Sequence, residues 1–240
     1  MSTFDVRIIR GTERAVPAAD INIVIDVIRA FTVSHVAFSR GAHAIFLVNT
    51  VDEAFALKAR HPDYLLAGEI AGLPIADFDL DNSPFNVSRA DVDDKTLVMK
   101  TTHGVTATLA ALNAAQIFVT GFSNARQTAQ HAQTLMASKG YRTVNVIASH
   151  ALDDDDFSCA EYIRDQLLDL GQIEPEAIMA RIRNSRSAKK FQVVEKNGFE
   201  PRDLDFCTRE VMSDFVMEVD KSLPAPRLIK QRLRVEAMAS

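Results

Sequence analysis

Short apolar segments alternate with helix-like segments through the first 170 residues, and this alternation constrains the fold more than any other feature. Most of the apolar segments are rich in Val, Ile or Leu, and they end in polar turns. The segments that we interpret as strands are residues 6–9, 21–25, 44–48, 64–67, 96–99, 116–120 and 143–148. Strands that alternate with helices form parallel sheets with helices packed against them. The sequence therefore predicts an α/β fold with a mostly parallel sheet flanked by helices.

The pattern changes at about Pro175. Residues 175–222 have a helix-like composition around an irregular segment at 195–201, and the basic segment 227–235 is typical of a surface tail or a packing helix. We find no linker rich in Pro, Gly or Ser in the sequence. We therefore predict a single domain over residues 1–240, in which residues 175–240 form a mainly helical C-terminal part.

Composition narrows the class of protein. The chain has 240 residues, of which 47% are hydrophobic and 25% charged, as in ordinary globular proteins. A net charge of -5 gives no reason to expect a nucleic-acid partner, and no apolar run is long enough to span a membrane. The two cysteines have no metal-like spacing, and the first residues lack a signal-peptide pattern. We expect a cytoplasmic protein, with a homo-oligomer as the default assembly for a chain of this size.

Polar side chains gather where the predicted strands end. Asp26 directly follows the strand at 21–25, Arg29 lies one helical turn further, and Glu69 follows the strand at 64–67. Ligands of α/β sheets bind outside these carboxyl ends. Asp26 could cap a helix and pair with Arg29, or it could hold a divalent cation beside a phosphate-binding arginine. In the second interpretation, Glu69 adds a further oxygen ligand.

Residues 101–104 begin a helix after the strand at 96–99. The hydroxyl groups of Thr101 and Thr102, the free N–H groups and the helix dipole favour an anion there, and Lys100 adds positive charge. The same residues would also serve as an ordinary N-cap without any anion. Both interpretations stay open on the sequence alone.

Two acidic segments invite competing interpretations. The loop at 77–81 is not a calcium loop, because Asn82 replaces the required Gly and the twelfth position is not Glu. It also resembles the nucleophile loop of haloacid-dehalogenase-like phosphatases, with Asp79 as nucleophile and Asp81 as acid–base, although Asp77 interrupts the apolar strand that such a loop follows. The run at 153–156 is typical of a solvated loop, of which one member could face a site.

The order of these motifs resembles the 2-phosphosulfolactate phosphatase family. That family comprises magnesium-dependent acid phosphatases associated with coenzyme M biosynthesis in methanogens, and its members also occur widely in bacteria. The resemblance extends from about residue 20 to residues 203–207. The segments that carry it are Val24-Ile-Asp-Val-Ile-Arg-Ala30, Leu66-Ala-Gly-Glu69, Phe78-Asp-Leu-Asp-Asn-Ser-Pro84, Thr101-Thr-His-Gly104 and Gly121-Phe-Ser-Asn124.

The resemblance implies an activity and a set of site residues. The activity is magnesium-dependent hydrolysis of a phosphate monoester of a small acid, with 2-phospho-3-sulfolactate giving 3-sulfolactate and phosphate. The implied metal ligands are Asp26, Glu69 and Asp79, and the implied catalytic residues are Asp26, Arg29 and Asp79. The implied substrate-binding residues are Asn82, Lys100, Thr101, Thr102, Gly104 and Asn124.

The chain also departs from the family pattern. Asp77 and Asp81 stand where the family usually has Gly, His103 replaces Asn, and Val105 replaces Thr. A late motif, usually Cys-Ala-Gly followed by Glu-Asp, corresponds to residues 148–150 and 155–156. Two alternatives therefore stay open: a haloacid-dehalogenase-like phosphatase, or an inactive anion-binding protein on the same scaffold. Whether a phosphoenzyme forms is open as well.

Overall fold

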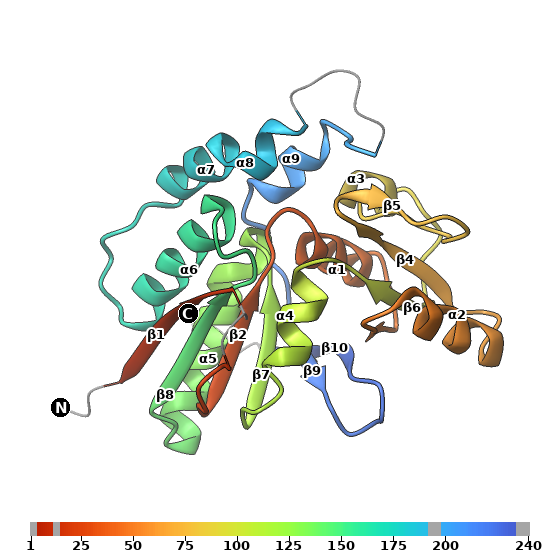
Figure 1. The fold of residues 1–240 in the computed structure, drawn as a ribbon. Coiled ribbons are helices and arrows are strands. Elements are labelled where there is room, and N and C mark those ends of the chain that lie inside the picture. The colour runs from red at the N-terminus through yellow and green to blue at the C-terminus, as the bar shows by residue number, and fades with distance from the viewer. Residues whose placement is uncertain (1–3, 12–14, 192–197, 234–240) are drawn as a thin grey trace, which may run out of the picture.

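The computed structural model describes residues 4–11, 15–191 and 198–233 (Figure 1). Within these ranges the strands form one ten-stranded sheet in the order β1-β8-β2-β7-β9-β10-β3-β6-β4-β5. The strands are β1 (Asp5–Arg10), β2 (Ile21–Ile25), β3 (Ala44–Leu47), β4 (Leu65–Ile70), β5 (Leu73–Pro74), β6 (Thr96–Lys100), β7 (Gln116–Thr120), β8 (Thr143–Ala148), β9 (Phe215–Asp220) and β10 (Arg227–Arg232). The α/β fold expected from the sequence is confirmed.

Helices follow most of the strands, as the alternating pattern indicated. They are α1 (Ala30–Ser39), α2 (Val51–Arg60), α3 (Pro84–Val87), α4 (Gly104–Ala110), α5 (Ala125–Lys139), α6 (Asp154–Leu167), α7 (Pro175–Asn184), α8 (Arg186–Lys189) and α9 (Asp203–Cys207), with a 3-10 turn at Phe122–Asn124. Thr50 is the N-cap of α2 and forms a capping box, in which the Thr50 hydroxyl accepts from the Glu53 N–H at 3.1 Å. None of the described helices is long and apolar enough to cross a membrane.

The sheet consists of two parallel blocks joined by an antiparallel hairpin. One block pairs β1, β8, β2 and β7, the other pairs β3, β6 and β4, and the hairpin β9–β10 lies between β7 and β3. The prediction of a mainly helical C-terminal part is therefore wrong for its last segments. Residues 215–220 and 227–232 are strands because they pair with each other and with distant strands. The segments at 195–201 and 227–235 lie partly outside the described residues.

Both faces of the sheet carry an apolar layer. The side chains of Ile21, Ile23 and Ile25 belong to the cluster that includes α5, α6 and α7, whereas Val24 belongs to the cluster with α1 and α4. A strand that is covered on both faces has a continuous apolar sequence, which explains why the sequence alone predicts β2. The packing of helices on both faces leaves the strand ends as the place where polar side chains converge.

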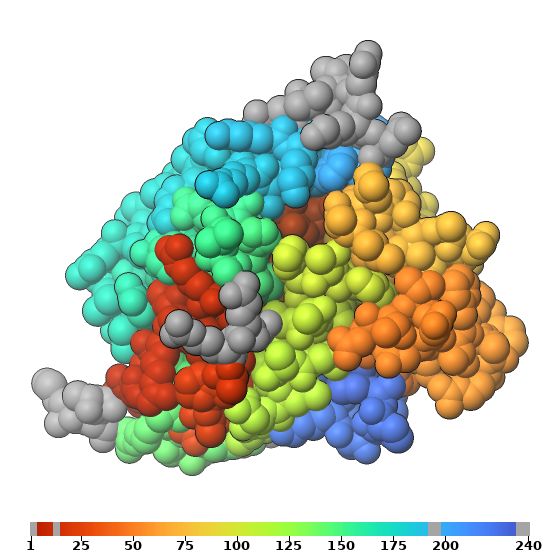
Figure 2. Space-filling model, in the orientation of Figure 1, coloured from red at the N-terminus to blue at the C-terminus, as the bar shows by residue number. Residues whose placement is uncertain are grey.

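Strand register brings the carboxyl ends together. In one block Ile25 pairs with Ala148 and Thr120, so Asp26 and Ser149 emerge side by side. In the other block Gly68 pairs with Lys100, which places Glu69 next to the turn at 101–104. Helices α7, α8 and α9 lie near this edge of the sheet (Figure 1). Figure 2 shows a hollow between these segments, with the chain near the end of β2 at its floor.

Candidate active site

A cavity of about 260 Å³ opens at the carboxyl ends of β2, β4 and β8. Both parallel blocks and the C-terminal segment contribute to its wall. Five of the residues implied as metal ligands, catalytic residues or substrate-binding residues line it, namely Asp26, Arg29, Glu69, Asn82 and Thr102. Residues that follow separate strands therefore converge on one cavity.

Other predicted residues lie elsewhere. The Asp79 carboxylate does not line the cavity; it accepts from the Leu66 N–H at 2.7 Å and from Lys58 at 3.3 Å. The buried Asn124 bonds to the Thr120 hydroxyl at 2.9 Å. The structure therefore gives Asp79 and Asn124 local structural contacts and does not bring them to this site.

Only part of the turn at 101–104 faces the cavity, and its other residues stabilise the local structure. The buried Thr101 hydroxyl accepts from the Val105 N–H in the first turn of α4 at 3.1 Å, and Lys100 does not line the cavity. Gly104 packs directly on Asp26, because a Cβ at this position would lie 2.6 Å from an Asp26 carboxylate oxygen. Glycine is therefore required here by close packing. Only the next residues of the turn, Thr102 and His103, face the cavity.

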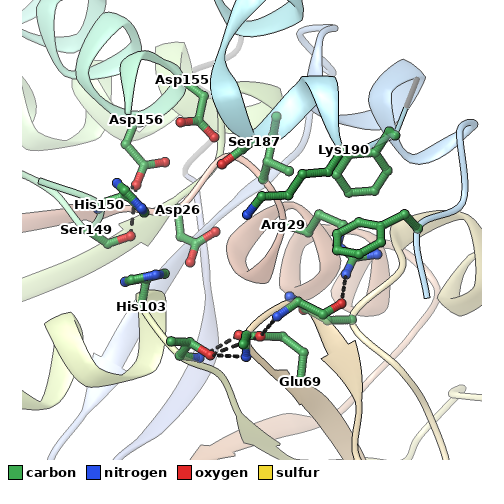
Figure 3. A pocket seen from close by; sticks show the side chains of 17 residues that line it. Asp26, Arg29, Glu69, His103, Ser149, His150, Asp155, Asp156, Ser187 and Lys190 are labelled. Atoms are coloured by element: carbon green, nitrogen blue, oxygen red, sulfur yellow. Dashed lines mark hydrogen bonds between the residues drawn. The ribbon is translucent and has the colours of Figure 1, made fainter. Parts of the chain in front are cut away.

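Three buried carboxylates line one wall of the cavity. Asp26, Asp155 and Asp156 are 5%, 2% and 2% exposed (Figure 3). Asp156 accepts from the Val27 N–H at 2.8 Å, the Ser149 hydroxyl at 2.8 Å and the His150 N–H at 3.0 Å. The expectation of a solvated loop at 153–156 is wrong for these residues, because the start of α6 packs against the strand ends.

Burial dominates the electrostatics of this wall. The pKa of Asp26 is raised well above its ordinary value, first by burial and then by the charge of Asp156, while the Ala30 N–H bond opposes the change. Burial and the charge of Asp156 likewise raise the pKa of Asp155. Its Oδ1 atom is buried without a hydrogen-bond partner among the described residues. Carboxylates held so close together favour a cation between them.

Glu69 joins two loops at the opposite wall. The carboxylate accepts from the Gly72 N–H and the Thr102 N–H, and from the Thr102 hydroxyl at 3.0 Å. The side chain is only 6% exposed, so these bonds offset the cost of burying its charge. Glu69 therefore fixes the shape of this wall while its charge still acts on Asp26.

Nitrogen-bearing side chains occupy the rest of the cavity. The rings of His103 and His150 lie with their centroids 4.6 Å apart, and Lys190 extends from the C-terminal segment (Figure 3). The pKa of His103 is lowered, mainly by burial and then by the charge of His150. The cavity thus presents carboxylates on two walls, with the two histidines beside the aspartates and the Lys190 ammonium group facing them (Figure 3).

Sequence reasoning missed part of this site. Asp155 and Asp156 could have been found, because they match the late acidic motif of the family pattern. Ser187 and Lys190 lie in a segment without any recognisable motif, and only the tertiary packing places them here.

An α/β fold with a buried carboxylate cluster at its strand ends is typical of enzymes that bind small anions with a cation. The family model described as 2-phosphosulpholactate phosphatase matches residues 9–222. The chain therefore belongs to this family of phosphoric monoester hydrolases, and the resemblance inferred from its motifs is confirmed.

Similar proteins agree with this assignment. The chain is 48% identical to a protein of Bacillus subtilis (strain 168) named "Probable 2-phosphosulfolactate phosphatase", over 93% of this chain and 97% of that protein. It is 32% identical to a protein of the same name from Caldicellulosiruptor saccharolyticus, over 82% of this chain and 87% of the relative. A third such protein, from Clostridium beijerinckii, is 28% identical over 82% of this chain and 88% of the relative.

Proposed function

We propose that this chain is a magnesium-dependent phosphatase that hydrolyses 2-phospho-3-sulfolactate to 3-sulfolactate and phosphate. The observation that carries the proposal is the group of three buried carboxylates, Asp26, Asp155 and Asp156, in a cavity of a chain from this family. A volume of about 260 Å³ lies below the roughly 300–1,000 Å³ of typical drug-sized sites, which suits a small acid.

The donor atoms fit magnesium. In the ranges that the structure describes, no three His, Cys, Asp or Glu side chains form a ready-made metal cage. Magnesium needs none, because it keeps several waters and uses one or two carboxylates together with substrate phosphate oxygens. Asp26 and Asp156 would hold the ion, with Asp155 and Glu69 acting through water. Asp79, which the family resemblance implied as a ligand, is not part of this set.

The bound ion would supply charge stabilisation at the phosphate oxygens. The remaining work belongs to residues of the chain. The two histidines line the wall beside Asp26, where a ring N–H group can bind the phosphate or the second acidic group. The aspartates and Glu69 repel an anionic substrate unless a cation neutralises them, so substrate binding depends on the ion.

The alternative with Asp79 as nucleophile is less well supported. Asp79 is bonded to a backbone N–H and to Lys58, and it does not line the cavity. An inactive anion-binding role would leave the buried carboxylates unexplained. Cytoplasmic location and homo-oligomeric assembly stay predictions.

A phosphate-release assay tests the proposal. The purified chain should release phosphate from 2-phospho-3-sulfolactate with magnesium, and EDTA should abolish the release. Asp26→Asn should also abolish it, whereas Asp154→Asn, in the same acidic run but 46% exposed, should retain it. Release that is undiminished in EDTA or in Asp26→Asn would rule out the proposed metal site.

A further inference from the structure

We propose that Lys190, rather than Arg29, is the residue of this cavity that contacts the anionic groups of the substrate. The inference rests on the proposed function, because it assumes that an anionic substrate occupies the cavity. It goes further because it assigns substrate binding to the lysine and a structural role to the arginine among the side chains that line the described cavity.

The guanidinium group of Arg29 already forms hydrogen bonds with other residues of the protein. Its Nη1 donates to Asp203 at 2.9 Å and to the Gly198 carbonyl at 3.2 Å, and its Nη2 donates to the Gly72 carbonyl at 3.1 Å. The guanidinium is 4% exposed and lies 5.0 Å and 5.6 Å from the ring centroids of Phe191 and Phe199. Its charge is therefore paired with a buried carboxylate and partly covered by aromatic rings.

These contacts make Arg29 a positioning residue. Its three partners are Gly72 in the loop after β4, Gly198 in the segment before α9, and Asp203 at the start of α9. Arg29, which directly precedes α1, thus holds two sides of the cavity together. A substrate that took the guanidinium as its partner would have to break a buried ion pair, which is costly.

Lys190 makes no ion pair or hydrogen bond through its ammonium group with any of the described residues, and it is exposed. Figure 3 shows it extending into the cavity, with the nitrogen directed toward the space in front of Asp26. Its charge acts on His103, on the facing wall, which places the ammonium group within electrostatic reach of the cavity centre.

The backbone that carries Lys190 is firmly held. The buried Asp153 carboxylate accepts from the Arg186 N–H at 2.9 Å, and from the Ser187 N–H and hydroxyl at 2.7 Å each. Phe191, directly after Lys190, is 2% exposed. The segment is therefore anchored on both sides, and only the side chain of Lys190 is left to adjust to a ligand.

The chemistry of the cavity calls for such a residue. An ion held by Asp26 and Asp156 would supply positive charge for the phosphate from one side, and a substrate with further acidic groups needs a cation on the other. A lysine ammonium group serves as a point charge for phosphate and other oxyanions. Lys190 meets this need, because it approaches from the C-terminal segment, opposite the strand ends.

The test compares Lys190→Met with Lys189→Met. Lys189 is the adjacent exposed lysine and does not line the cavity, so it is a matched control for lost charge. We expect kcat/KM for 2-phospho-3-sulfolactate to fall about 10- to 100-fold in Lys190→Met, the loss typical of one charge-assisted contact, and to change less than about twofold in Lys189→Met. Lys190→Arg should restore part of the activity.

A binding measurement separates this inference from the proposed function. Titration calorimetry with inorganic phosphate and magnesium should show at least about tenfold weaker binding in Lys190→Met than in the control. Equal binding and equal kcat/KM in the two variants would overturn the role of Lys190, and so would a wild-type chain that binds no phosphate. A wild-type chain that binds phosphate through Lys190 but does not hydrolyse the substrate would overturn only the proposed function.

Discussion

Replacing Asp203 by Asn tests how strongly the C-terminal segment is held over the cavity. Asp203 is fully buried and accepts from Arg29 at 2.9 Å, the Ser83 hydroxyl at 2.6 Å and the Phe85 N–H at 3.1 Å. Burial raises the pKa of this carboxyl, while the Ser83 bond and the charge of Arg29 act in the opposite direction. Asparagine keeps the shape and one acceptor oxygen, but it leaves the Arg29 charge buried without a counter-charge.

The magnitude follows from the loss of one partner of a buried pair. Such a loss costs about 3–5 kcal/mol of unfolding free energy. At about 2–4 °C per kcal/mol for a chain of this length, the melting temperature should fall by about 6–20 °C. The assay is urea and thermal unfolding followed by circular dichroism, together with KM, which should rise because α3, α9 and Arg29 no longer fix the cavity wall.

Asp205 offers the matched control. It lies two residues away, its side chain is 71% exposed, and its carboxylate is 3.8 Å from Arg183. Asp205→Asn should change stability by less than about 0.5 kcal/mol. The reasoning is refuted if Asp203→Asn and Asp205→Asn unfold at the same urea concentration.

Three further outcomes are expected. Asp79→Asn should keep kcat/KM within a few-fold of wild type, whereas Asp156→Asn should lower it by about 100-fold or more. Equal losses of kcat/KM in the two variants would show that Asp79 takes part in the reaction. Magnesium at about 100 times its Kd should add about 2.7 kcal/mol of stability in a melting experiment, and Asp26→Asn should remove this gain; a gain that persists would place the ion elsewhere. Burial lowers the pKa of His35 to about 4 from 6.5, so the unfolded chain takes up the proton first. Stability should therefore fall by about 3 kcal/mol as the pH drops from 6.5 towards 4. His35→Gln should flatten this dependence while the exposed His43→Gln should not, and identical curves for the two variants would contradict it.

The central strands could be predicted because they are buried on both faces, and their consecutive residues are therefore apolar. Strand β2 is apolar at nearly every position, as a strand covered on both faces must be. Strands β9 and β10 could not be predicted in the same way. A short apolar run such as 215–219 fits a helix as well as a strand, and β10 carries Arg, Lys and Gln around the buried Leu228. Both segments form strands because they pair with strands that lie far away in the sequence.

The residues of the site can be grouped in the same way, into those that the strand pattern predicts and those that only tertiary packing places. Asp26 and Glu69 could be predicted because parallel strands end at one edge, so residues after separate strands converge. Asp79 seemed equivalent, but its carboxylate turns to the backbone of β4 and to Lys58. Lys190 could not be found, because its place depends on how the C-terminal segment packs across the strand ends.

A crystal structure with magnesium and 3-sulfolactate would test the central claim most directly. We expect density for both in the cavity, with the ion nearest to Asp26 and Asp156. An acidic group of the product should lie about 3 Å from the Lys190 ammonium group. Product bound at the 77–81 loop beside Asp79, with nothing in the cavity, would contradict the account.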